Sequence, residues 1–194
     1  MLNLIVFGAP GSGKGTQGKA LASHYGLEHI STGDLLRDEI RRGTDLGKQA
    51  EKLISGGHLV PDDLIISLLE EKLEGTPTRK GIILDGFPRT VSQAKSLHQL
   101  LGNSTDDYTV LVDLKVEEHE LIRRLLERGK VSGRSDDNEA TIKERLKVYH
   151  STTEPVIDYY KEKGNHLEIA AEGDIDEITE KIVMELASDM ARAR

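Results

Sequence analysis

Short apolar segments recur along the chain and have the pattern of buried β-strands. Leu2–Phe7 is an almost continuous apolar run that ends at a glycine. Gly81–Asp85 and residues 109–114 have the same character, and His166–Ala170 shows it more weakly. Continuous apolar runs of this length are typical of strands that are covered on both faces, as in a parallel sheet. Residues 27–31 are predicted to add a further short strand.

Longer segments with helical periodicity separate the predicted strands. One helix begins at Ser31 or Thr32, either of which can cap it, with Asp34 favourably placed in its first turn. Strands that alternate with helices form βαβ units and a parallel sheet with helices on both faces. We therefore expect an α/β fold of three layers around a five-stranded parallel sheet. The other predicted helices cover residues 14–24, 45–55, 61–73, 90–101, 117–127, 138–163 and 174–191.

The composition is that of an ordinary globular domain, and 194 residues are enough to bury a sizeable core. The net charge of −8 argues against nucleic acid or an anionic membrane as a partner, because both need a cationic surface. The chain has no cysteine, which excludes disulfides and thiolate metal sites and fits a reducing compartment. No apolar run approaches the ~20 residues that span a bilayer, and no signal sequence is recognisable, so we expect a cytoplasmic protein.

The first predicted strand is followed by a glycine-rich segment, residues 8–16 (GAPGSGKGT), and then by a helix. Phosphate groups need several backbone N–H donors that converge on one point, together with a cation. Glycine lets the backbone approach closely, the helix N-terminus adds a favourable dipole, and Lys14 supplies the charge. The usual motif has Ser or Thr directly after the lysine, whereas here Gly15 comes before Thr16. A turn that binds nothing is the alternative, but the strand before it and the helix after it favour a phosphate loop.

The carboxylate of Asp85 stands at the end of a predicted buried strand. Ligands of α/β sheets lie at the carboxyl ends of the strands, and an aspartate there can hold Mg²⁺, directly or through water, beside a triphosphate. The alternative is an aspartate that caps the following helix. The phosphate loop elsewhere in the chain favours metal support.

Arginines recur near the predicted loop mouths and helix ends. An acidic protein that gathers arginine at one cleft is suited to several phosphate groups, because guanidinium forks fit phosphoryl oxygens. Phosphoryl transfer needs alignment and charge neutralisation more than covalent chemistry, so a missing general base is no objection. Any single arginine could equally be solvated on a helix, and Arg41, Arg42 and Arg123 are interpreted in that way. The arginines assigned to the cleft are Arg37, Arg89, Arg124, Arg128, Arg134 and Arg145.

Together these motifs resemble the adenylate kinases, in the form of the family that has a short flap, over essentially the whole chain. No other family with a phosphate loop carries all of them in this order, and the Lys-Gly-Thr sequence is normal in this family. The matching segments are GAPGSGKGTQ (8–17), STGDLLR (31–37), HLVPD (58–62), LDGFPRT (84–90), Gln93, RLLERG (124–129), SGRSDDNE (132–139) and AEGD (171–174).

The resemblance implies reversible, Mg²⁺-dependent transfer of the γ-phosphoryl group of ATP to AMP, which gives two ADP. It also implies a single kinase domain, residues 1–194, in which two small lobes move to exclude water. Arg124 and Arg128, four residues apart on one helix, would both face the flap. Because the flap is short and has no cysteine, we expect no zinc. The core would be residues 1–30, 61–126 and 138–194, the AMP-binding lobe residues 31–60 and the flap residues 127–137.

The site roles that the resemblance implies divide between two nucleotides. On the ATP side they fall to Gly11, Ser12, Gly13, Lys14, Gly15, Thr16, Arg124, Arg128 and the backbone of Gly173. On the AMP side they fall to Thr32, Arg37, His58, Leu59, Val60, Gly86, Phe87, Pro88, Arg89, Gln93, Arg134 and Arg145. Catalytic roles are implied for Lys14, Arg89, Arg124, Arg134 and Arg145, flap anchoring for Asp136 and Asp137, and support of Mg²⁺ through water for Asp85.

Other functions remain open on the sequence. A UMP/CMP kinase would share the chemistry, but those relatives carry Ala in the place of Thr32 and Asn in the place of Gln93, whose amide can pair with the adenine edge. A nucleotide-switch GTPase would need a guanine-reading Asn-Lys-x-Asp segment, which the sequence lacks. A catalytically dead relative would be expected to lack Lys14 or one of the cleft arginines, and this sequence has all of them.

The expected partners are therefore ATP, AMP and ADP as substrates, and nothing in the sequence requires more than a monomer. The histidines show no metal-ligand spacing and are interpreted as surface or structural residues, except that the backbone of His58 would line the AMP pocket.

Overall fold

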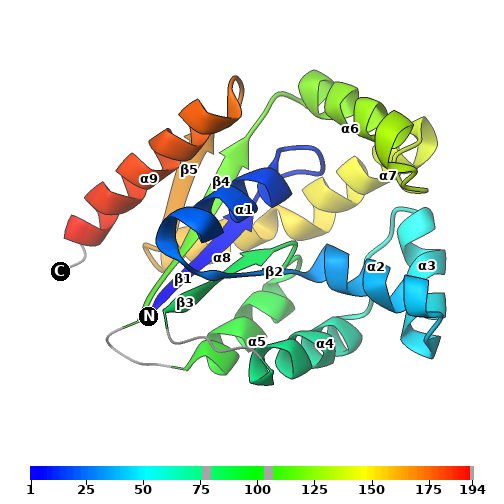
Figure 1. Ribbon diagram of the computed structural model, residues 1–194, viewed down its shortest axis with the longest axis horizontal. Coiled ribbons are helices and arrows are strands. Elements are labelled where there is room, and N and C mark those ends of the chain that lie inside the picture. The colour runs from blue at the N-terminus through cyan, green and yellow to red at the C-terminus, as the bar shows by residue number, and fades with distance from the viewer. Residues whose placement is uncertain (76–79, 103–106, 193–194) are drawn as a thin grey trace.

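The centre of the protein is a five-stranded sheet with the order β2-β3-β1-β4-β5, in which every neighbouring pair of strands is parallel (Figure 1). The computed structural model describes residues 1–75, 80–102 and 107–192. The sheet confirms the predicted α/β fold. Its strands are β1 Leu2–Phe7, β2 Glu28–Ser31, β3 Gly81–Asp85, β4 Tyr108–Lys115 and β5 His166–Ala170.

Helices connect the strands and cover both faces of the sheet (Figure 1). They are α1 Lys14–Tyr25, α2 Thr32–Arg42, α3 Asp45–Ser55, α4 Asp62–Glu74, α5 Val91–Leu101, α6 Glu118–Ser132, α7 Glu139–Val148, the π-helical segment Tyr149–Thr153, α8 Pro155–Glu162 and α9 Ile175–Arg192. Within residues 1–75, 80–102 and 107–192, no helix is long and apolar enough to cross a membrane.

Two hydrophobic cores follow from the alternation of side chains along each strand. Leu4 and Val6 of β1 belong to the core that α1 and α9 close, whereas Ile5 and Phe7 belong to a larger core on the other face. The larger core receives side chains from α2 through α8. The strands are therefore buried on both sides, as their continuous apolar sequences predict.

The helices α2 and α3 form a pair beside the β2 edge of the sheet (Figure 1). Ser31, rather than Thr32, caps α2: its side chain accepts a hydrogen bond from the backbone N–H of Asp34 at 3.4 Å. A Cβ at Gly47 in α3 would lie 2.2 Å from the carbonyl oxygen of Glu39 in α2. The two helices thus cross in direct backbone contact, which glycine alone permits.

The predicted helix over residues 117–127 is longer in the structure, because α6 continues to Ser132 and ends at Gly133, whose φ is 63°. Gly129 does not break this helix. A Cβ at this residue would lie 2.7 Å from the carbonyl oxygen of Asp137, so glycine is needed there for close packing.

The predicted helix over residues 138–163 is interrupted in the structure. It consists of α7, the π-helical segment and α8, which begins at Pro155. Proline has no N–H to donate to the preceding turn, so the regular ladder of hydrogen bonds stops before it. The backbone N–H of Glu154 instead donates to the carbonyl of Tyr149 at 2.8 Å, across the wider π-type turn.

Candidate functional site

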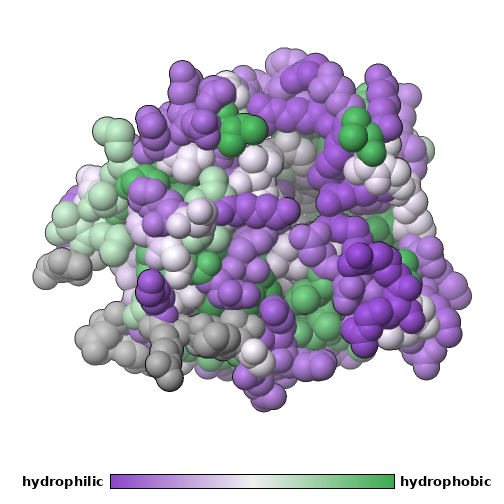
Figure 2. All heavy atoms as spheres, viewed as in Figure 1, coloured by the Kyte–Doolittle hydropathy of each residue, from purple (hydrophilic) through white to green (hydrophobic). Residues whose placement is uncertain are grey.

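A cleft of about 1010 Å³ opens where β1 and β3 end. The site residues predicted from the sequence lie there. Parallel sheets leave such a crevice at the carboxyl ends of their strands, where successive connections run to opposite sides, as they do from β1. The loop before α1, the α2–α3 pair, the segment after β3, α6 and α7 supply its walls. Figure 2 shows the hollow, whose rim is mostly hydrophilic. Every residue assigned to ATP, AMP or the metal lines this cleft, while their roles stay predictions.

The loop between β1 and α1 has a backbone conformation that requires glycine. Gly8, Gly11 and Gly13 have φ values of 137°, 90° and 94°. A Cβ at Gly11 would also lie 2.9 Å from the carbonyl oxygen of Leu121 in α6. Gly13 caps α1 without a side-chain hydrogen bond, which leaves the positive end of the helix open to an anion.

Lys14 begins α1, and its ammonium group turns back over the loop. Nζ donates to the carbonyl oxygens of Gly8 and Ala9, at 2.7 and 2.8 Å. Burial lowers the pKa of Lys14 to about 7; the charge of Asp85 opposes this shift and nearby arginines reinforce it. Negative charge brought to this place, such as a phosphate group, would stabilise the charged form of Lys14.

Asp85 ends β3 beside the same loop. Its Oδ2 atom lies 3.3 Å from the position that a Cβ at Gly15 would take. A larger residue between Lys14 and Thr16 would therefore be in tight contact with the carboxylate. Carboxylate and hydroxyl oxygens are ligands that Mg²⁺ prefers, and a single carboxylate suits an ion that keeps several waters and phosphate oxygens. The carboxylate of Asp85 at the phosphate loop therefore fits Mg²⁺.

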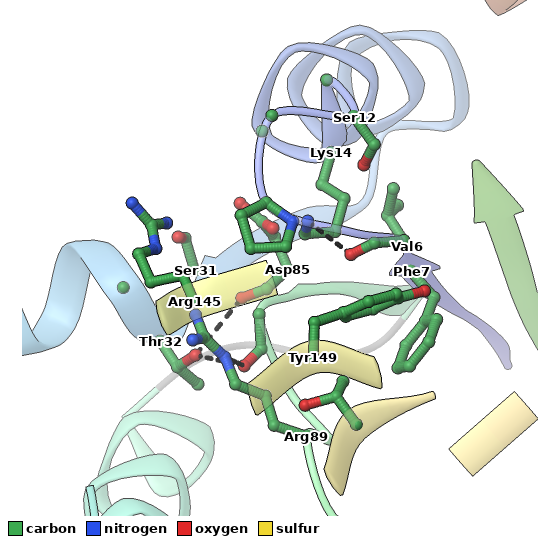
Figure 3. Close-up of a pocket in the computed structure, with 18 of the residues that line it drawn as sticks. Val6, Phe7, Ser12, Lys14, Ser31, Thr32, Asp85, Arg89, Arg145 and Tyr149 are labelled. Atoms are coloured by element: carbon green, nitrogen blue, oxygen red, sulfur yellow. Dashed lines mark hydrogen bonds between the residues drawn. The ribbon is translucent and has the colours of Figure 1, made fainter. Parts of the chain in front are cut away.

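The segment after β3 forms the opposite wall of the cleft (Figure 3). The carbonyl of Gly86 accepts hydrogen bonds from the Thr32 hydroxyl at 2.9 Å and from Nε of Arg89 at 2.8 Å. A Cβ at Gly86, whose φ is 79°, would lie 2.9 Å from Oγ1 of Thr32. The following Phe87–Pro88 peptide bond is cis. Thr32 and Arg89 thus share one backbone carbonyl and are held on the same wall.

Positive charge accumulates where Arg89 faces the cleft. Burial lowers the pKa of Arg89, and the charges of Arg145 and Arg37 lower it further. Burial and Arg37 likewise lower the pKa of Arg134. Arg37 pairs with Asp34 at 2.5 Å, but neither Arg89 nor Arg134 has a carboxylate within ion-pair distance among the residues described. Phosphate groups in the cleft would supply the negative charge that these arginines lack.

Two of the arginines on the flap side, Arg128 and Arg145, are held by carboxylates. Arg128 donates two hydrogen bonds to Asp137, from Nε at 2.6 Å and from Nη2 at 2.7 Å. Nη1 of Arg145 lies 3.0 Å from Oδ1 of Asp137 and 2.7 Å from Oδ2 of Asp136. The Asp137 side chain is 0% exposed. Burial alone would raise the pKa of Asp137, but the hydrogen bonds and charge of Arg128 hold it below its ordinary value.

Arg124 points to a different part of the cleft, so the prediction that it faces the flap together with Arg128 is wrong. Its Nε donates to Oε1 of Glu120 at 2.7 Å, and both terminal nitrogens lie 3.3 Å from the carbonyl oxygen of Ala171. Glu120, one turn earlier on α6, draws the guanidinium toward the segment after β5. Arg128 has no such partner one turn earlier and reaches Asp137 instead.

Two further lining residues, Glu120 and Gly57, were not predicted. The four-residue spacing of Glu120 and Arg124 on a helix was a signal for the first. A Cβ at Gly57 would lie 3.2 Å from Cγ of Arg145 and 3.2 Å from the carbonyl oxygen of Thr141. Gly57 therefore allows the turn after α3 to approach α7 at Arg145, a contact between distant segments that no local pattern reveals.

The arginines interpreted as solvated pair with acids on their own helices. Arg41 contacts Asp38 at 2.8 Å and Arg42 contacts Glu39 at 2.6 Å. Arg123 binds Glu120 and Glu127, and it also lines the cleft.

One histidine lies in a group of possible metal ligands away from the cleft. Ligand atoms of Asp113, His166 and Glu168, on β4 and β5, all lie within 4.8 Å of one another. Spacing along the chain does not reveal this group, because strand pairing brings its members together. Nζ of Lys115 already lies 2.9 Å from Oδ2 of the buried Asp113, so an ammonium group balances that charge.

Comparison with known proteins extends over nearly the whole chain. Residues 6–165 match the family model described as adenylate kinase. The adenylate kinase of Parabacteroides distasonis is 55% identical over 94% of this chain and 96% of its own length. The adenylate kinases of Phocaeicola vulgatus and Bacteroides thetaiotaomicron are 51% and 52% identical, over 94% and 92% of this chain and 97% and 94% of their own lengths.

Proposed function

The chain belongs to the adenylate kinase family, and from this premise we propose how its cleft performs the family's reaction. The protein is a phosphotransferase that moves the terminal phosphoryl group of ATP to AMP, with two ADP as products. The cleft holds both nucleotides at once, with ATP along the phosphate loop and AMP along the wall after β3. The reacting phosphate groups meet between Lys14 and Arg89.

On the donor side, the loop from Gly11 to Thr16 surrounds the phosphate groups of ATP. The open N-terminus of α1 and the Lys14 ammonium supply fixed positive charge. Arg124 and Arg128 add guanidinium groups from α6, and the backbone of Gly173 contacts adenine. When phosphate enters, Lys14 exchanges its two loop carbonyls for phosphoryl oxygens and keeps its charge.

On the acceptor side, Arg37 and Arg89 bind the phosphate of AMP. Thr32, Gln93 and the backbone at Gly86 and at His58, Leu59 and Val60 surround the nucleoside, with Phe87 and Pro88 shaping the wall. The absence of a carboxylate beside Arg89, within the described part of the chain, supports this assignment because the anion is left for the ligand to supply.

The catalytic residues are Lys14, Arg89, Arg124, Arg134 and Arg145. They neutralise charge on the transferring group while its bond to ADP breaks and its bond to the AMP phosphate oxygen forms. A phosphate monoester is largely anionic at neutral pH, so the attacking oxygen needs no general base. Arg134 and Arg145 reach the transferring group from the flap side, where Asp136 and Asp137 position the flap.

Asp85 would hold Mg²⁺ through a water molecule, and the ion would supply positive charge that offsets the phosphate groups of ATP. In this scheme the Asp85 carboxylate accepts a hydrogen bond from that water. The chain has no cysteine for a structural zinc site in the flap.

Two lobes are proposed to close over the bound nucleotides, residues 31–60 over AMP and residues 127–137 over ATP. The core is then residues 1–30, 61–126 and 138–194. Closure excludes water, which would otherwise compete with AMP for the phosphoryl group. We further propose that the enzyme works as a cytoplasmic monomer.

A single observation carries the two-nucleotide proposal: one cleft of about 1010 Å³ is lined both by the phosphate loop and by Arg89 and Arg134, which have no carboxylate partner among the described residues. The test is a coupled assay with ATP and either AMP, CMP or UMP as acceptor. We expect AMP to have at least a tenfold higher kcat/KM than either pyrimidine nucleotide, because Thr32 and Gln93 line the acceptor wall. A tenfold preference for CMP would instead support a UMP/CMP kinase.

A further inference from the structure

Asp62, at the start of α4, takes part in a partly buried hydrogen-bond network with Gln93, although no nucleotide role has been assigned to it above. Nε2 of Gln93 donates to Oδ1 of Asp62 at 2.7 Å, and the Thr90 hydroxyl donates to Oδ2 at 2.8 Å. Both carboxylate oxygens are therefore engaged. Gln93 lines the cleft but is only 2% exposed, so its amide has little access to water.

The oxygen of the Gln93 amide also has a hydrogen-bond partner. The backbone N–H of Arg89 donates to Oε1 of Gln93 at 2.6 Å. Thr90 caps α5, and its Oγ1 accepts from the backbone N–H of Gln93 at 3.1 Å, which fixes the start of the side chain as well. The amide thus has a partner on its nitrogen and another on its oxygen.

These two partners allow only one orientation of the amide. A carboxylate can only accept a hydrogen bond and a backbone N–H can only donate one. If the amide were flipped, its oxygen would face the Asp62 carboxylate and its NH₂ group would face the Arg89 N–H. Each contact would then set like groups against each other in a buried position, where an unmade hydrogen bond is costly.

We infer that Asp62 is a positioning residue that selects the base of the acceptor nucleotide by locking the orientation of Gln93. The inference rests on the proposed function, in which Gln93 meets the base of AMP. One amide hydrogen and one oxygen lone pair of Gln93 remain for the base, in a fixed order.

This order fits a 6-aminopurine and not a 6-oxopurine. Adenine presents an N6–H donor beside the N1 acceptor, which match the amide oxygen and the amide hydrogen. Hypoxanthine presents an O6 acceptor beside an N1–H donor, which is the reverse pattern. AMP and IMP are otherwise the same in size and charge, so IMP is the sharpest probe of the lock. A site with fixed polar groups rejects a mismatched analogue because those groups stay unpaired.

The test compares wild type with Asp62→Asn, in which the side-chain shape is kept but the obligate acceptor is lost. An asparagine can face either end of the Gln93 amide. We expect the ratio of kcat/KM for AMP to that for IMP to fall about tenfold, the effect of one lost charge-assisted hydrogen bond, while KM for ATP changes less than twofold. Asp62→Ala removes the acceptor altogether and is expected to lower the same ratio by a similar factor.

Asp63→Asn is the matched control, since Asp63 is an exposed residue that stands next to Asp62 in the first turn of the same helix. It loses the same charge and should keep the wild-type ratio of AMP to IMP use. If Asp62→Asn lowers use of AMP and IMP equally, Asp62 is merely structural and the inference is wrong. If wild type does not phosphorylate AMP, the proposed function fails whatever Asp62 does. Binding of AMP and IMP by calorimetry gives the same comparison for a variant of low activity.

Discussion

The phosphate loop and the flap-side arginines both bring positive charge to the cleft, but they hold it in different ways. The loop is fixed by backbone geometry: Gly11 lies against the carbonyl of Leu121, and Lys14 is bound to carbonyls of the loop itself. Arg128 and Arg145 are instead tied to the buried carboxylate of Asp137. A phosphate can enter the loop directly, whereas it must compete with an aspartate for the two arginines.

This difference separates binding from closure. Fixed backbone dipoles need no rearrangement when the ligand arrives, so they suit the first encounter with ATP. Ion pairs that can exchange one anion for another suit a segment that changes its contacts during the reaction. The same arginines can then stabilise the flap when no ligand is bound and the phosphate groups of the ligand when it is bound.

The largest effect is expected from Lys14→Met, which removes the only charged side chain of the phosphate loop. We expect kcat with ATP and AMP to fall about 10²- to 10³-fold, because a fixed donor to the transferring group is lost. Steady-state kinetics measure this, with Lys181→Met on the exposed face of α9 as a control that keeps its activity. A loss of less than tenfold would mean that the loop works through its backbone alone.

A smaller effect is expected from Asp137→Asn, which should lower the stability of the fold and leave the phosphate loop unchanged. Removing the charge of the buried Asp137 leaves Arg128 without a charged partner and Arg145 with Asp136 alone, so the free energy of unfolding should fall by about 3 kcal/mol. Urea unfolding measures the change. Asp158→Asn, an exposed substitution on α8, provides the control and should alter stability by less than about 0.5 kcal/mol.

The pH dependence of that difference sharpens the comparison further. The pKa of Asp137 is held below its ordinary value of 3.8 in the folded state. Its stabilising contribution is therefore complete above the ordinary value and disappears as the pH falls through the lowered folded value. Wild type and Asp137→Asn should converge in stability in strong acid. A difference that persists there would show that Asp137 acts through packing and not through charge.

The structure of the phosphate loop could be predicted well from the sequence, whereas the contacts of the flap-side arginines could not, because only the loop depends on local signals. The glycines at positions 8, 11 and 13 and the strand before them are local signals, and the structure has the expected strand, turn and helix there. The ion pairs of Asp137 join side chains from α6 and α7 across a turn whose path no local pattern gives. Gly129 in α6 also packs against that turn, at Asp137, which is a tertiary contact.

The acceptor side shows the same division. Thr32, Arg89 and Gln93 could be assigned from motifs, and all of them line the cleft. The contacts that hold these side chains could not be predicted from motifs, because they join distant parts of the chain. Asp62 and Gln93 are 31 residues apart, and Thr32 and Gly86 are 54 residues apart. Motifs identify residues that face a ligand, but the contacts that orient them come from the tertiary fold.

The central claim, that one cleft holds donor and acceptor nucleotides side by side, is tested most directly by titration calorimetry with a dinucleotide that joins two adenosines through a chain of phosphates. We predict that one molecule binds per protein chain and that the saturated protein then binds neither ATP nor AMP. Binding of two molecules per chain, or a protein that still takes up AMP when saturated with the dinucleotide, would contradict the account.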